Sequence, residues 1–456
     1  MARIISIIHR VKRTIEGEPR PTILVIESDG KKIEHVLATE DDELDWLQGR
    51  MPVSWQEIQK DHDLGSVFAR HVKWKKITPE EAVDAPVGRV IFDKVKKSYY
   101  LMHKVPKEYG GFQAGDIILM ILGGSGDCLA FALSNRSKEI GAKVLRVASC
   151  HLKDEREKDC EVSLVETIDL LKVKANGDSY LLLDLFKERP ELFMVCDKRD
   201  RELIRLREFR NNRQVAMEDR VKAEQRLYAR HCGSVFLSED GRYPEGLIKD
   251  AFTERKVNDK IVQALQVEEN TREAELKVVV RRLDVWQEVF EPIEGCGEII
   301  AAAIIDAIGD IRRFPNKAKL KAYAGVHVWN NDYKNMPKDT IRQASDGSFV
   351  RSRRGVRLNS KTQLRQALYL LGDQFKRRPD SVWGQKLREY KVKFRIIHPE
   401  PVVVQGAGGK KVIKYSDGHI HKMAMWRTIT KFAEKLWVEW TKIEKEKEAK
   451  EAVQKS

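Results

Sequence analysis

The stretch PIEGCGEIIAA, residues 292–302, has the form of a helix–hairpin–helix turn. Gly295 and Gly297 stand two residues apart, and glycine lets the backbone turn tightly because it has no Cβ. The apolar run that follows begins a helix, and the free N–H groups of a helix N-terminus are a ready site for phosphate. The stretch therefore predicts a phosphate-binding turn. A plain helix–turn–helix pair without a ligand is the alternative.

Two long charged stretches precede this turn. Residues 201–231 are rich in arginine and carry apolar residues at helical spacing, namely Leu203, Leu206 and Phe209. Residues 257–290 carry a second apolar stripe, made of Ile261, Leu265, Leu276, Val280 and Leu283. Two long charged helices in series predict an antiparallel coiled-coil arm over residues 196–291. An ordinary helical pair within one domain is the alternative.

The beginning of the chain has an α/β pattern. Residues 4–8 and 22–27 are apolar runs rich in β-formers, and residues 32–37 alternate after a Ser-Asp-Gly turn. Thr39 with Asp42 then opens a short helix. These signals predict three strands followed by one helix.

A second strand pattern follows farther along. The run DIILMIL, residues 116–122, is continuously apolar, as in a strand buried on both faces. A helix up to Ile140 and a strand over residues 144–147 come next, so we expect a parallel pair. Residues 50–110 contain four prolines and are predicted to be an irregular insertion.

Composition narrows the class of protein. The chain has 456 residues, enough for two or three domains, and 84 Lys and Arg against 70 acids give a net charge of +14. Such an excess favours polyanion partners, because each neutralised phosphate releases counterions. A basic but unspecific surface is the alternative.

The sequence also argues against a membrane or a metal-thiolate protein. No run reaches the roughly 18 apolar residues of a membrane span, and the apolar residues 1–10 are interpreted as a buried strand rather than a signal peptide. None of the six cysteines forms a C-x-x-C pair, which argues against a zinc site or a disulfide frame. Scattered thiols fit a reducing cytoplasm, the expected location.

Residues 301–325, AAAIIDAIGDIRRFPNKAKLKAYAG, extend the glycine turn. The turn, IGDIRRF, a basic link and LKAYAGV together resemble the C-terminal domain of transposases of the insertion-sequence-110 type (IS116/IS902), also called Piv/MooV or DEDD recombinases. Further similarities follow in the same order: the basic loop at 353–355, the LRQAL helix at 364–368 and a final helix over 421–437. The resemblance is specific over 292–370 and weak before 190.

The resemblance implies an α/β + α architecture. The sequence pattern itself predicts the insertion at about 50–110 and a charged, solvated tail over 441–456. The resemblance adds a RuvC-like (RNase H-like) domain over 1–195, the coiled-coil arm over 196–291 and an α-helical transposase domain over 292–440. It also implies DNA as substrate, a guide RNA, and four acids that hold Mg²⁺. Carboxylate oxygens suit Mg²⁺, which polarises phosphate oxygens.

The acidic positions of the family are poorly matched here. The place of its first aspartate falls on Ile8, that of its glutamate on Gly123, and that of its third acid on Ala175. Asp178 keeps the fourth place, and Asp127 lies four residues after Gly123. Asp178 and Asp127 are therefore the candidate catalytic acids and metal ligands.

The family's proposed serine nucleophile is better matched. Ser345 and Ser348 precede a basic loop, as the serine of the family does. A serine needs a base, a metal or cationic neighbours to react. Phosphate clamping is expected from five arginines: Arg351, Arg353, Arg354, Arg357 and Arg365. A flexible Ser/Gly loop is the alternative.

Basic residues also alternate with aromatic ones. Trp329, Tyr333 and Lys334 form one such group, and residues 376–378 with Trp383 form another. The pattern suits backbone contact with nucleic acid and stacking of bases, and it equally suits an amphipathic surface.

Three functions remain. The first is a DNA transposase or site-specific recombinase of the DEDD type that works with a guide RNA and divalent metal. The second is a catalytically degenerate relative that keeps nucleic-acid binding and acts as a regulator or interaction protein. The third, a Holliday-junction-type nuclease, shares the RuvC-like fold and lacks the 292–325 unit. The coiled-coil arm leads us to expect a homo-dimer or tetramer.

Overall fold

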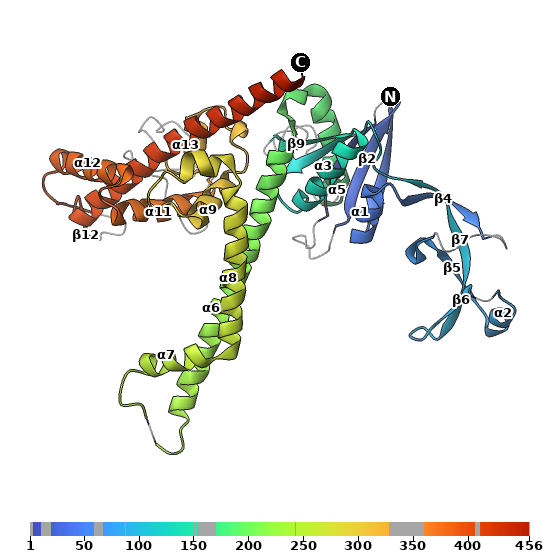
Figure 1. Ribbon diagram of the computed structural model, residues 1–456, viewed down its shortest axis with the longest axis horizontal. Coiled ribbons are helices and arrows are strands. Elements are labelled where there is room, and N and C mark those ends of the chain that lie inside the picture. Colours follow the sequence, from blue (N-terminus) through green and yellow to red (C-terminus); the bar gives the residue numbers. More distant parts are fainter. Residues whose placement is uncertain are drawn as a thin grey trace. The chain divides into compact units, whose positions relative to one another are not determined.

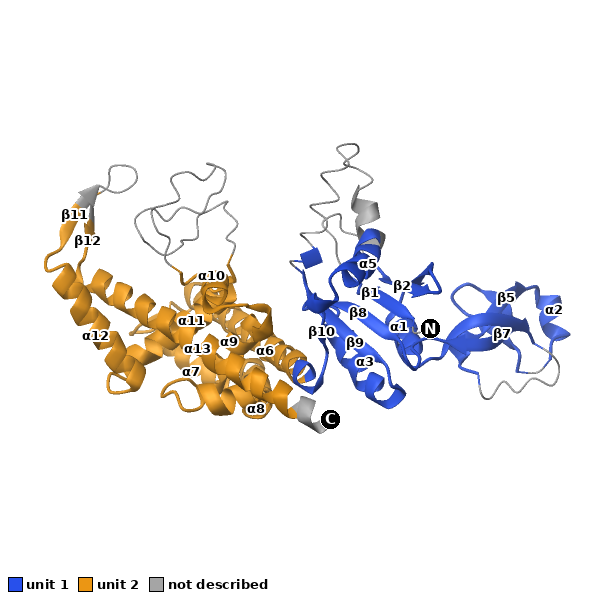
Figure 2. Cartoon of the chain, turned by 90° about the horizontal axis from the view of Figure 1, so that it is seen from above, with its two compact units in different colours: residues 1–201 blue, residues 202–456 orange. Residues whose placement is uncertain are grey.

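The structure, a computed structural model, describes residues 3–10, 20–58, 67–86, 88–149, 151–152, 170–241, 243–327, 360–405 and 411–455. Contacts within the chain divide it into two compact units, residues 1–201 and 202–456 (Figure 2). No described helix is both long and apolar enough to cross a membrane.

A six-stranded sheet forms the centre of the first unit, in the order β10-β9-β8-β1-β2-β3. β1 (Ile4–Ile8), β2 (Thr22–Ser28) and β3 (Lys31–Leu37) form an antiparallel meander. β8 (Ile117–Leu122) runs parallel to β1, and β9 (Lys143–Ala148) runs parallel to β8. A short β10 (Met194–Val195) closes the sheet antiparallel to β9. The strands and the parallel pair expected from the apolar runs are confirmed.

Helices cover both faces of this sheet. α5 (Leu170–Glu188) packs on the face that carries Leu119 and Val147. α3 (Asp127–Ile140) packs on the other face, where Met120 and Arg146 lie opposite each other in register. Figure 2 shows the two helices on opposite sides of the strands. A strand covered on both faces must be apolar along its whole length, which explains the unbroken run in β8.

The helix termini follow their expected signals. Thr39 caps α1 (Glu40–Leu47) through a capping box with Asp42, as the sequence predicts. α3 ends at Gly141, whose φ of 72° is left-handed. A short turn η2 (Pro190–Leu192) connects α5 to β10.

Within residues 50–110, the described part consists mainly of strands and short helices, so the prediction that this part is irregular is wrong. They form a separate four-stranded sheet of β4 (Met51–Glu57), β5 (Lys73–Ile77), β6 (Val90–Asp93) and β7 (Ser98–Gly110), with η1 (Ala69–His71) and α2 (Pro79–Val83). Pro79 occupies the first turn of α2, and Pro52 lies beside a register shift in β4. Prolines are tolerated at such positions. Register shifts in these strands interrupt the alternation of apolar and polar residues by which a strand is recognised in a sequence, so the strands were missed.

The second unit begins with a long helical pair. α6 (Lys198–Phe236) leads through α7 (Ile248–Asn258) to α8 (Lys260–Arg281), and α6 and α8 lie side by side (Figure 1). Arg213 lies 3.4 Å from Glu269, while Lys256 lies 2.8 Å from Glu224. Arg213, in the first half of α6, thus contacts α8, and Glu224, farther along α6, contacts α7, which precedes α8. The two helices of the pair therefore run antiparallel. The coiled-coil assignment stays a prediction.

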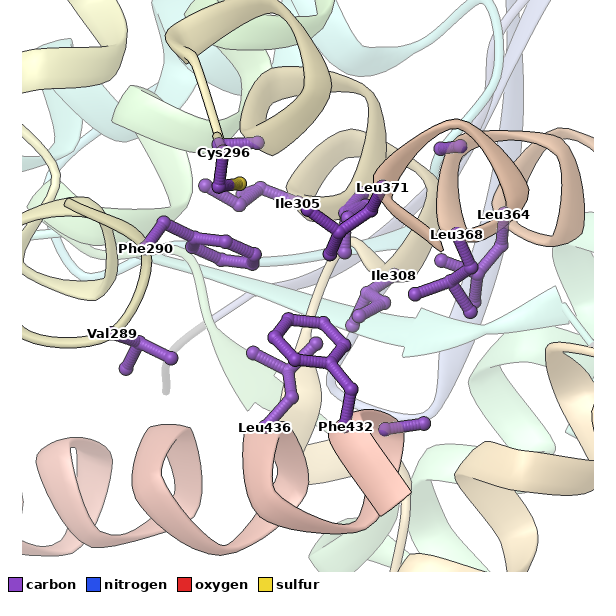
Figure 3. Packing of buried hydrophobic residues seen from close by; sticks show 14 of the residues in the cluster. Val289, Phe290, Cys296, Ile305, Ile308, Leu364, Leu368, Leu371, Phe432 and Leu436 are labelled. Carbon is purple, nitrogen blue, oxygen red and sulfur yellow. The ribbon is translucent and has the colours of Figure 1, made fainter. Parts of the chain in front are cut away.

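The main core of the second unit surrounds α9 (Glu298–Ile308). It is built from η3 (Trp286–Phe290), η4 (Ile311–Arg313), α10 (Lys317–Tyr323), α11 (Thr362–Arg377), α12 (Val382–Ile397) and α13 (Asp417–Lys455). A hairpin of β11 (Val402–Gln405) and β12 (Lys411–Lys414) lies between α12 and α13 in the chain. Phe290, Ile305, Leu371 and Phe432 converge in the centre of this core (Figure 3).

The charged tail is less solvated than expected. Ile443 and Glu444 are buried, and the Trp440 indole donates a hydrogen bond of 3.0 Å to Glu444. Lys447 lies 2.6 Å from Asp284. A fully solvated tail from residue 441 onward is therefore wrong, because α13 continues to pack against the core beyond Trp440.

Phe432 provides a test of this core. Its ring contacts those of Phe290, Phe375 and Trp383, and its side chain is 1% exposed. Phe432→Ala should lower the free energy of unfolding of the second unit by about 3–5 kcal/mol, because it leaves a cavity among rigid neighbours. Urea unfolding of the full chain measures this. Val438→Ala, at a 48% exposed position of the same helix, should change stability by less than about 0.5 kcal/mol. Equal effects of the two variants would contradict the packing.

Candidate nucleic-acid interface and acidic site

The glycine turn joins η3 to α9. Gly295 has a φ of 86°, and a Cβ added there would lie 2.8 Å from the Arg378 guanidinium. Gly297 is the N-cap of α9 in extended conformation, with no side-chain cap and no atom within 4 Å of an added Cβ. Gly295 is therefore required by the backbone. Gly297 leaves open space beside the first amides of α9.

An acidic side chain already lies at this helix terminus. Glu298, the first residue of α9, accepts hydrogen bonds of 2.9 and 2.6 Å from Arg281. Burial alone would raise the pKa of Glu298, but hydrogen bonds from its own amide and from Arg281 hold the pKa below its ordinary value. A negative charge stabilises a helix N-terminus, so a phosphate must compete with this carboxylate.

Two described arginines that could contact a phosphate, Arg365 and Arg378, lie at opposite ends of α11. Arg378, at the C-terminal end, lies beside Gly295 and donates a 2.7 Å hydrogen bond to Gln374. Arg365, near the N-terminal end, lies over the Trp426 ring at 4.9 Å. Thirteen helical residues separate the two arginines, roughly 20 Å. The structure thus brings Arg378 to the glycine turn, whereas Arg365 is held elsewhere.

Trp383 belongs to the core. Its ring stacks on Phe375 at 5.6 Å, and the residue is only 7% exposed. The interpretation of Trp383 as a base-stacking residue is therefore wrong, because its apolar neighbours in α11 and α13 already cover the ring.

Most of the expected catalytic loop lies outside the described residues. This applies to both candidate nucleophiles, Ser345 and Ser348, and to four of the five arginines: Arg351, Arg353, Arg354 and Arg357. It applies also to Trp329, Tyr333 and Lys334. Their roles remain predictions.

An ion-pair cluster attaches α10 to α13. Glu434 accepts hydrogen bonds from Lys321 at 2.6 Å and from Lys431 at 2.7 Å. Burial would raise the pKa of Glu434, but the two lysines outweigh this effect and lower its pKa to about 2. Glu434 is therefore an anion throughout the ordinary pH range, and it fixes α10 on the long final helix.

Ile8, the position that matches the family's first aspartate, lies on the face of the sheet that α5 covers. Ser6 is the register partner of Leu119, and side chains two apart on a strand share a face, so Ile8 lies on the same side. Ile8 packs against the apolar cluster that includes Leu182 on α5. Ser6 is fully buried. Apolar packing, not a carboxylate, thus occupies this end of β1.

The second place, Gly123, cannot easily hold a glutamate. Its φ is 87°, a left-handed conformation that strains any residue with a Cβ. Asp127 lies at the start of α3, is 5% exposed and forms an ion pair with the buried Arg146 of β9. A carboxylate already neutralised by an arginine is a poor ligand for a cation.

Asp178 and Asp127 lie on opposite faces of the sheet. Asp178 is a half-buried residue of α5, which packs against β1, β2 and β8, while Asp127 belongs to α3 on the other face. Among the residues that the structure describes, no group of three or more His, Cys, Asp or Glu could hold a metal ion. The described side chains therefore do not fit a four-carboxylate Mg²⁺ site.

A cavity lined by both polar and leucine side chains lies beside the residues that follow β1. It has a volume of about 470 Å³, and its lining includes His9, Arg10, Glu43 and Ser125. Glu43 is the centre of this cluster, at 3.4 Å from His9 and 3.2 Å from Arg10, and accepts a 2.5 Å hydrogen bond from Thr22. No sequence motif marked these residues, because the contacts join β1, β2 and α1.

Residues 287–332 match the sequence profile described as the Transposase IS116/IS110/IS902 family. Over these residues the chain is similar to the transposases of that family. The matched segment, called here the transposase segment, contains the glycine turn, α9, η4 and α10. No curated protein matches the chain at a significant level. The family resemblance seen in the turn and in IGDIRRF is thereby confirmed.

Gly297 and Glu298 allow binding at the turn to be tested apart from folding. Gly297→Ser should leave the melting temperature unchanged or slightly higher, because serine is a good N-cap, but should weaken DNA binding severalfold by competing for the same amides. Glu298→Gln should strengthen binding, because it removes a negative charge next to the phosphate. Fluorescence anisotropy with labelled duplex DNA measures both. Unchanged affinity in both variants would make the turn purely structural.

The Glu434 cluster predicts a dependence of stability on pH. The folded pKa of about 2 lies below the ordinary 4.5, so the stabilisation is fully present above pH 4.5 and is lost as the pH falls through about 2. At pH 6, Glu434→Gln should lower the free energy of unfolding by an amount on the order of 2 kcal/mol. The difference from the parent should close towards pH 2. Glu446→Gln, at an exposed position of α13, is the control. A difference independent of pH would contradict the ion pairs.

Proposed function

We propose that the chain is a DNA transposase or site-specific recombinase of the DEDD type that exchanges DNA strands under the direction of a guide RNA. The observation that carries this proposal is the transposase segment at residues 287–332. Its glycine turn leaves open space beside the amides of α9, with Arg378 next to it. Amides and a guanidinium at one turn suit a DNA phosphate.

The sheet of the first unit supports a RuvC-like domain. An antiparallel meander β1–β3 is followed by β8 and β9, which run parallel to β1, and helices cover both faces, which is compatible with such an α/β domain. Such an assignment rests on topology, and function must be argued from the site.

The described residues at the acidic positions do not support metal-dependent catalysis. Ile8 and Gly123 stand at two family positions, and Asp127 is paired with Arg146. The described residues at these positions therefore do not fit a Mg²⁺ ion. The role of Ser345 as nucleophile and that of Asp178 as an acid of the site stay predictions for direct test.

The arm supports self-association. α6 and the segment after it expose apolar side chains, among them Phe236 at 69%, Leu237 at 81% and Leu247 at 71%. Exposed apolar patches of this kind mark interaction surfaces. We propose that the chain forms a dimer or tetramer through this arm.

A strand-exchange assay tests the catalytic proposal. The full chain, supplied with RNA transcribed from the flanks of its own coding segment, Mg²⁺ and donor and target duplexes, should form joined products. Ser345→Ala and Asp178→Asn should each reduce product at least about 100-fold, the usual scale for losing a catalytic group. Asp184→Asn is the control, because Asp184 is an exposed residue of the same helix paired with Lys32.

The outcomes separate the candidate functions. Product in the parent and its loss in the two variants would support the proposal. Undiminished product in both variants would remove these residues from the mechanism. Salt-sensitive binding without product in the parent would favour a nucleic-acid-binding relative that has lost catalysis.

A further inference from the structure

The four-stranded sheet of β4, β5, β6 and β7 takes no part in the sites described above. Few of its described side chains are buried, and Val105 is the most completely enclosed. Phe92 and Ile91 of β6 are 48% and 47% exposed. Among the described residues, the short helix α2 contacts β7, and much of the rest of the sheet is exposed.

Lysines line its edge strand. β5 has the sequence KWKKI, and Lys73, Lys75 and Lys76 are all exposed. Lys104 of β7 is the register partner of Lys73. Among the described residues, no ion pair engages Lys73, Lys75 or Lys104. Lysines on an edge strand also prevent unwanted pairing with other chains, so their charge alone does not identify a partner.

Aromatic rings share the face of these lysines. Side chains alternate along a strand, so Lys73, Lys75 and Ile77 lie on one face, and Tyr99 is the register partner of Ile77. The Lys73 ammonium lies 4.0 Å from the centre of the Trp55 ring, which places Trp55 on that face.

The face therefore has two aromatic positions with lysines between them. Tyr99 packs on Phe92 with ring centres 4.8 Å apart. Lys73, near Trp55, and Ile77, opposite Tyr99, are separated by four residues of β5, roughly 13 Å. The one described acid in register with this row is Glu57, opposite Lys104.

We propose that this face binds single-stranded nucleic acid. Bases stack on Trp55 and on the Phe92–Tyr99 pair, while Lys73, Lys75 and Lys104 contact phosphates. Aromatic side chains stack on unpaired bases of any sequence, and lysines follow the backbone. A duplex offers phosphates but keeps its base faces stacked, and an acidic protein would leave the rings unused. The choice of nucleic acid rests on the proposed function.

The test uses the full chain and labelled 12-nucleotide single strands of identical sequence in DNA and RNA. The double variant Lys73→Ala/Lys75→Ala should weaken binding of both strands and reduce the slope of log affinity against log salt by about 1.4. Trp55→Ala should weaken binding about tenfold, and Trp55→Phe should restore most of it. Lys31→Ala/Lys138→Ala removes the same charge at exposed positions of the first unit and is the matched control.

The readouts distinguish this proposal from the proposed function. Duplex binding, measured in parallel, should respond to Gly297→Ser and not to Trp55→Ala. Single-strand affinity that is equal in the β5 variant and in its control would overturn the proposal while the transposase function stands. If the parent protein binds neither duplex nor single strands, both the single-strand proposal and the proposed transposase function would be overturned. Melting curves of each variant confirm that the sheet is folded.

Discussion

Burial of α9 on nearly every side is the constraint on which the second unit depends. Alanines and isoleucines occupy all of its faces, and Ala301, Ile304 and Ile305 are fully enclosed. A helix that is apolar all round must be surrounded by other elements. α8, α11 and η3 pack around it, and the arm is attached through Arg207 and Arg210, both of which bind Asp306. The short turn before α9 is thereby held in position by the packing of α9.

Electrostatics then decides what that turn can bind. Gly297 leaves open space beside the start of α9, Arg378 adds a nearby cation, and the Glu298 carboxylate, paired with Arg281, already lies at this helix terminus. The same logic applies in the first unit, where Arg146 neutralises Asp127 and apolar packing surrounds Ile8.

Some basic residues of the chain form ion pairs within the fold, whereas others do not among the described residues. In the arm, arginines such as Arg213 and Arg220 are paired with Glu269, and they stabilise helix contacts rather than offer free charge. In the small sheet, lysines of β5 stand beside aromatic rings without such partners among the described residues. Net charge alone indicates a polyanion partner, but only the contacts distinguish the charges that hold the fold from those that remain for a ligand.

The sequence by itself determined the elements whose signals are local. The capping box at Thr39, the unbroken apolar run of β8 and the glycine turn before α9 each predicted their structure, because short-range sterics and periodicity set them. Only the tertiary structure decided the rest. The sheet of residues 51–110, the burial of Trp383 and the pairing of Asp127 with Arg146 depend on partners distant in the chain. Packing and ion pairing act through space, and no spacing along the sequence records them.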